Sequence, residues 1–132
     1  MLNLLKRLIY KGDTESLKPV EFEFTCEIRF TLKIKNLIIG YLSVENELWN
    51  FRYSDEFKKQ SKYARLTGFS DLEKIYKTDV LWPFFKIRIP GLKQPMIMDI
   101  IESENLDAKN EAVLLKRFGK KTMSNPYILD SV

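Results

Sequence analysis

Catalysis and metal binding depend on side chains that carry protons or electron pairs, and this chain of 132 residues contains few suitable groupings. It has no histidine, the commonest general base and a frequent zinc ligand. Its five glycines stand far apart, so none belongs to a glycine-rich phosphate loop. We therefore expect no catalytic residues, no metal and no cofactor, and we interpret the chain as a protein that is not an enzyme.

The carboxylates leave one catalytic alternative open. Glu21 and Glu23 lie on one side of an alternating run and have the spacing of an acid–base pair on a strand. Charged residues at every second position are, however, typical of a solvated strand face. Asp71 and Asp79 lie near expected helix starts, where a capping role accounts for them.

The densest chemical signal is one of contact. Between Thr78 and Gly91 the chain places Trp82, Phe84 and Phe85 around a single proline. Aromatic side chains bury a large area at a small cost in conformational entropy, so such a cluster suits either a core or an interface. For Trp82 both roles stay open, and Phe84 and Phe85 should point to different sides of a helix.

The first half of the chain is typical of strands. Apolar residues alternate with polar ones from Val20 to Ile34, which predicts one long bent strand, or two strands joined by a bulge near residues 25–29. Residues 37–42 are apolar on both sides and contain Gly40, which suits a bulge or a close approach. A turn at 45–47 and a returning aromatic strand at 48–53 predict a hairpin.

The second half is typical of helices. We expect a helix from Asp79 to about Ile87, capped by Thr78. Two further helices are predicted over 95–104 and 108–118, the first beginning with a proline and carrying an isoleucine stripe.

The helix over 108–118 should be capped by Asp107 and should end at a left-handed Gly119. Strands first and helices after predict an α+β fold. Its antiparallel β-sheet, bent and partly barrel-like, would lie in the N-terminal half, with helices from the C-terminal half packed on it.

Composition limits the location and the partners. The net charge is +4, and the basic residues are scattered, which argues against direct nucleic-acid binding. The lone Cys26 excludes an internal disulfide and indicates a reducing compartment. Residues 1–10 are too short and too charged for a membrane span and make a poor signal peptide. We expect a cytoplasmic protein that does not enter a membrane.

Several elements, taken in their order, resemble the N-terminal subdomain of the HipA family of toxin–antitoxin serine/threonine kinases. The resemblance covers roughly Phe30 to Ile128. The residues that carry it are Gly40-Tyr41-Leu42, Leu48-Trp49-Asn50-Phe51-Arg52-Tyr53, Tyr76, Trp82-Pro83-Phe84-Phe85, Ile89-Pro90-Gly91, Leu114, Leu115 and Gly119. Residues 120–126 depart from the family pattern, and the kinase catalytic loop, its metal-binding aspartate and its ATP-binding loop have no counterpart.

The resemblance implies a division of the chain. Residues 1–29 would form an N-terminal extension, made of a short helix and the start of the long strand, and residues 30–132 the family-like domain, within one globular unit. In the short helix Leu4, Leu5 and Leu8 would share one side.

The resemblance also implies a regulatory function. Stand-alone versions of this subdomain act as antitoxins of a separately encoded HipA-type kinase, so this chain would dock on the kinase's nucleotide-binding lobe, in a complex that can include a helix-turn-helix repressor. The expected partner-binding residues are Tyr76, Trp82, Phe84, Phe85 and Arg88. The alternatives are an interaction module of a DNA-bound repressor complex without kinase inhibition, a small enzyme of unknown type, and a homodimer.

Overall fold

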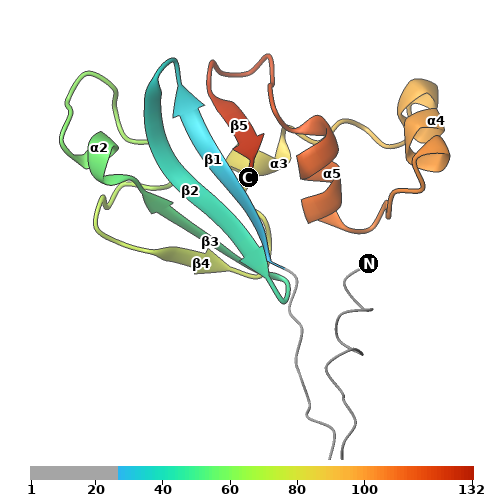
Figure 1. Ribbon diagram of the computed structural model, residues 1–132, viewed down its shortest axis with the longest axis horizontal. Helices are drawn as coiled ribbons and strands as arrows, with labels where there is room; N and C mark the ends of the chain where they lie inside the picture. Colours follow the sequence, from blue (N-terminus) through green and yellow to red (C-terminus); the bar gives the residue numbers. More distant parts are fainter. Residues whose placement is uncertain (1–26) are drawn as a thin grey trace, which may run out of the picture.

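The computed structural model describes residues 27–132, and its centre is a five-stranded sheet (Figure 1). All neighbouring strands are antiparallel, in the order β4-β3-β2-β1-β5. The strands are β1 (Ile28–Ile34), β2 (Leu37–Glu45), β3 (Leu48–Tyr53), β4 (Tyr76–Thr78) and β5 (Ile128–Ser131). The helices are α2 (Asp55–Lys58), α3 (Pro83–Lys86), α4 (Pro95–Ser103) and α5 (Glu111–Phe118). The predicted α+β class with an antiparallel sheet is confirmed, and the sheet is open at β4 and β5.

Alternation decides which face of β1 enters the core. Phe30, Leu32 and Ile34 are buried, and the residues between them are more exposed. This confirms the predicted strand from residue 28 onward. Residues 20–26, with Cys26, Glu21 and Glu23, lie outside the described residues. The irregularity in the described part of β1 is not near residues 25–29 but farther along, between Leu32 and Lys33.

The bulge lies opposite, in β2, and next to a glycine that the packing requires. Leu32 pairs with Gly40 and Lys33 with Ile38, so Ile39 is the extra residue. A Cβ atom on Gly40 would lie 2.5 Å from the Arg52 carbonyl oxygen. The close approach expected at Gly40 is therefore confirmed, and it holds β2 against β3.

The β2–β3 hairpin closes as predicted. Asn46 and Glu47 form its turn, both with positive φ (55° and 62°), the conformation whose twist matches that of the flanking strands. β3 then runs over the predicted residues, and its Trp49, Phe51 and Tyr53 face the core.

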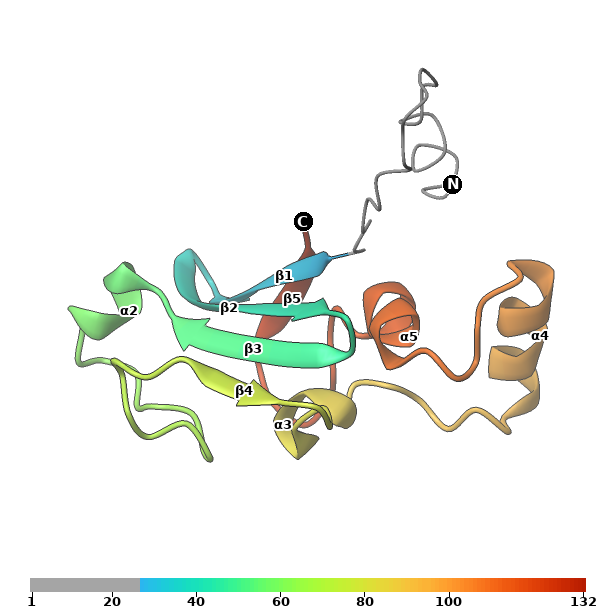
Figure 2. The ribbon, with the colours of Figure 1, turned by 90° about the horizontal axis from the view of Figure 1, so that it is seen from below.

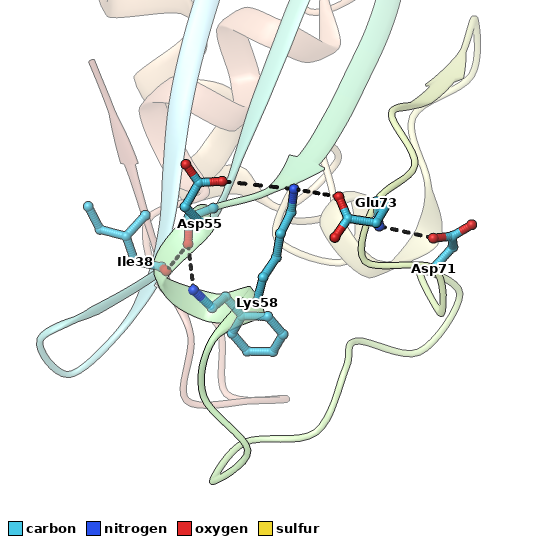
Figure 3. Close-up of polar contacts among 7 residues, drawn as sticks. Ile38, Asp55, Lys58, Asp71 and Glu73 are labelled. Atoms are coloured by element: carbon cyan, nitrogen blue, oxygen red, sulfur yellow. Dashed lines mark hydrogen bonds and ion pairs between the residues drawn. The ribbon is translucent and has the colours of Figure 1, made fainter.

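Ser54 fastens the end of β3 to β2. Its hydroxyl donates to the Ile38 carbonyl oxygen (2.6 Å) and accepts from the Phe57 N–H (3.0 Å), which caps α2. From α2, Lys58 reaches across to Glu73 (Nζ–Oε1 3.2 Å) in the loop before β4 (Figure 3). Glu73 belongs to the long connection that also carries Phe69.

The helices contribute unequally to the core. Phe57 of α2, Phe85 of α3 and Leu115 of α5 join the buried cluster on one face of the sheet. α4 has the predicted bounds but no buried residue, and it lies beyond α5, away from the sheet (Figures 1 and 2). The prediction that the C-terminal helices pack on the sheet is therefore wrong for α4. Within residues 27–132, no helix has the length and apolar character to cross a membrane.

The ends of α5 differ from the prediction. The helix begins at Glu111, because the Asn110 side chain caps it by accepting from two N–H groups of its first turn. Asp107 instead closes the preceding turn. Gly119 is not left-handed (φ −90°) but is needed for space, since a Cβ there would lie 2.6 Å from the Leu115 carbonyl oxygen.

Candidate partner-binding surface

Phe69 organises the surface that bears most of the predicted contact residues. It is only 1% exposed, although it lies in an irregular loop. The buried hydroxyl of Tyr53 holds this loop, because it donates to the Phe69 carbonyl oxygen and accepts from the Leu66 N–H (2.9 Å). Burial raises the pKa of Tyr53 above its ordinary value of 10.0, so the hydroxyl keeps its proton near neutral pH.

Three half-buried rings, Tyr76, Trp82 and Phe84, surround Phe69, and half-buried Tyr127 adjoins Phe84. We call these four residues the aromatic patch: Tyr76, Trp82, Phe84 and Tyr127. The ring centroids of Tyr76, Trp82 and Phe84 lie 5.0, 5.1 and 6.4 Å from that of Phe69. Phe84 continues the contact to Tyr127 at 5.8 Å. Edge-to-face packing of this kind fixes the rings in place and leaves part of each accessible.

The short helix α3 sorts the aromatic residues between the inside and the surface. Trp82 is its N-cap residue, and Pro83 occupies the first position, where a missing N–H costs least. The helix is thus shorter than the predicted 79–87, because Trp82, the residue before a proline, is extended (ψ 146°). Thr78, the predicted cap, belongs to β4 instead. Phe84 and Phe85 point to different sides, as expected.

Phe85 is a core residue rather than a contact residue of this fold. Its side chain is 0% exposed and lies 5.6 Å from Phe51, centroid to centroid. Because it has no accessible surface, it cannot anchor a partner directly. It supports the aromatic patch from below, 5.0 Å from Phe84 and 6.3 Å from Trp82.

Arg88 is likewise buried, with 3% of its surface exposed, so its prediction as a surface anchor is wrong. Its guanidinium donates to four oxygens of residues 119–127 at 2.9–3.1 Å: the carbonyls of Gly119, Lys120 and Tyr127 and the side chain of Asn125. Burial lowers its pKa to about 10, so it stays cationic at neutral pH. Arg88 thus positions the segment that bears Tyr127.

The sequence therefore located three surface residues, Tyr76, Trp82 and Phe84, and missed Tyr127. Tyr127 follows an Asn-Pro pair near the end of the chain. No local signal joins it to the other patch residues, which lie 43–51 positions earlier. The link is tertiary and runs through Arg88.

A separate groove of about 900 Å³ lies between the β2–β3 turn, the segment after α3 and the start of α5. Ile28, Ile89 and Leu92 form a partly exposed apolar floor, whereas the lining residues Val44, Trp49 and Leu114 are buried. Glu47, Asp79 and Asp107 line it as carboxylates, and none of these three forms an ion pair with another of residues 27–132.

Two lysines also line the groove, and they moderate its charge. Lys86 is paired with Glu111 (3.3 Å), whereas Lys109 lines the groove without an ion pair to another of residues 27–132. Among residues 27–132, no group of three or more His, Cys, Asp or Glu side chains is arranged to hold a metal ion. The chemistry that the groove offers is apolar contact with an acidic margin.

Comparison of the chain with models of known protein families and with curated proteins finds no match.

Proposed function

We propose that this chain is a non-catalytic regulatory protein that docks through its aromatic patch on the nucleotide-binding lobe of a separately encoded HipA-type serine/threonine kinase. The observation that carries the proposal is the patch itself, four partly exposed rings, of which three pack on Phe69 and the fourth, Tyr127, packs on Phe84. Rigid aromatic residues contribute most of the binding free energy in many protein interfaces, because little entropy is lost when they are covered.

The resemblance in the sequence supports the choice of partner. The residues that carry it include three of the four patch residues, together with the supporting Phe85. We propose that this regulation is an antitoxin role, in which docking suppresses phosphorylation by the kinase. The lone cysteine favours the cytoplasm as the compartment. Because the basic residues are scattered, we assign contact with DNA to a helix-turn-helix repressor in the same complex.

The test is co-expression of the full chain with a HipA-type kinase that lacks its own N-terminal subdomain and is encoded beside it. We expect the two to co-purify, and the complex to phosphorylate more slowly than the kinase alone. Trp82→Ala should weaken binding by about 30-fold or more, equivalent to about 2 kcal/mol.

Tyr41→Ala is the matched control, because Tyr41 is a partly exposed aromatic on the opposite, polar face of the sheet. It should change the dissociation constant less than threefold or so. Phe84→Gln provides a second patch variant in case Trp82→Ala loosens the fold. No complex, or wild-type affinity in both patch variants with native circular dichroism, would rule the proposal out.

A further inference from the structure

The groove has an acidic lining in an otherwise basic chain. Its lining carries four carboxylates and two lysines, a net charge of −2, whereas the whole chain has +4. The carboxylates are Asp107 and Glu111, close to the start of α5, and Glu47 and Asp79 from other segments. An occupant of this groove should therefore combine apolar side chains with positive charge.

One segment of the same chain has this composition. Residues 2–11, Leu-Asn-Leu-Leu-Lys-Arg-Leu-Ile-Tyr-Lys, contain three basic residues and no acidic one. Their leucines at positions 4, 5 and 8 would share one side of a helix. We propose that residues 2–11 dock in the groove of their own chain, with the leucines on the apolar floor and the basic side chains against the carboxylates.

The connection is long enough for this docking. Ile28 both begins β1 and lines the groove, so the chain enters the described structure at the groove itself. As a flexible coil, residues 12–27 would have an end-to-end distance of about 20–24 Å. If residues 20–27 were fully extended, residue 20 would lie about 26 Å from the groove. Residues 12–19 can span about the same distance, so residues 2–11 could still reach the groove.

Tethering favours this occupant over a second copy of the chain. A short connection gives the segment an effective concentration in the millimolar range, so even weak complementarity leaves the groove filled. The attraction between exposed charges is screened by salt. Apolar contact with the partly exposed Ile28, Ile89 and Leu92 would supply the part that salt does not weaken.

A spin label near the N-terminus tests the docking in the full chain. The labelled protein is Asn3→Cys in a Cys26→Ser background, observed by amide NMR. We expect signals from residues 44–49 and 107–114 to lose intensity, while those of α2, which follows the opposite end of β3, remain. A label at Thr14→Cys should affect the groove less, and Leu5→Asp combined with Leu8→Asp should restore the intensity.

Mixing separates docking within one chain from docking between two. Spin-labelled chains without isotope are combined with isotope-labelled chains without a spin label, and the docking that we propose leaves the groove signals of this mixture unchanged. Loss of intensity in the mixture would assign the groove to a second copy and overturn the proposal. Unaffected groove signals in the singly labelled chain would overturn it as well.

Discussion

Replacement of Arg88 should be among the most damaging single changes in this protein. The Arg88→Met variant keeps most of the apolar stem and removes the guanidinium, which holds four oxygens of residues 119–127 from a position that is 3% exposed. Four hydrogen bonds to a charged donor contribute roughly 1.5 kcal/mol each, about 6 kcal/mol together.

Burial of the charge opposes this gain. The pKa of Arg88 is lowered from 12.5 to about 10 by this burial, and its buried Nε has no hydrogen-bond partner among residues 27–132, which costs roughly 3 kcal/mol for a charged group. The net loss of unfolding free energy in Arg88→Met should then be about 3 kcal/mol, a large fraction of the total stability of a domain of this size. Urea denaturation followed by circular dichroism measures it.

Arg52→Met is the matched control, because the Arg52 guanidinium lies on the exposed face of the sheet over the ring of Tyr41. It should cost less than about 1 kcal/mol. If Arg88→Met and Arg52→Met unfolded at the same midpoint urea concentration, the account of Arg88 as the residue that fixes the segment 119–127 would be refuted.

Two further predictions concern the sheet and the loop above it. Gly40→Ala should lower the unfolding free energy by about 2–3 kcal/mol, because its Cβ would meet the backbone of β3. Gly91→Ala should be almost neutral, because its Cβ would meet only the end of a flexible glutamine 3.2 Å away. Equal losses of unfolding free energy for the two variants in urea denaturation would contradict this. Burial raises the pKa of Tyr53 above 10.0, so its hydroxyl ionises at a lower pH in the unfolded chain than in the folded one. The neutral hydroxyl therefore contributes its full stabilisation below about pH 10, and this contribution falls as the pH rises toward the raised pKa of the folded state. Tyr53→Phe should therefore be less stable than wild type at about pH 8, with a smaller difference at about pH 11, while Tyr41→Phe should show no such narrowing.

The strands followed from the sequence because their signals are local. β3 has the predicted bounds, since an aromatic-rich run follows a two-residue turn, and β1 keeps its alternation from residue 28 onward. Helix ends were harder to predict. Asp107 and Asn110 are both good cap residues; in the structure Asn110 caps α5, and Asp107 accepts from the Lys109 N–H in the turn before it.

The surface was only partly predictable. Trp82 and Phe84 stand out in the sequence. Arg88 follows them and suggests an exposed anchor, but nothing local shows that its guanidinium is bound by four oxygens more than 30 positions later. The groove could not be foreseen either, because its walls come from the β2–β3 turn, the segment after α3 and the start of α5.

α3 lies between the two surfaces and contributes to both. Phe84 belongs to the aromatic patch, and Lys86, two residues later, lines the groove. Opposite sides of one short helix thus serve the proposed kinase contact and the proposed contact with residues 2–11, so the two partners need not compete.

Hydrogen exchange on the complex of the full chain with its kinase tests the central claim most directly. If the aromatic patch is the docking surface, amides of residues 76–86 should exchange at least about tenfold more slowly in the complex, with smaller changes on the outer face of β1 and β2. Unchanged exchange at residues 76–86, with protection confined to α4 or to the outer face of the sheet, would contradict the account.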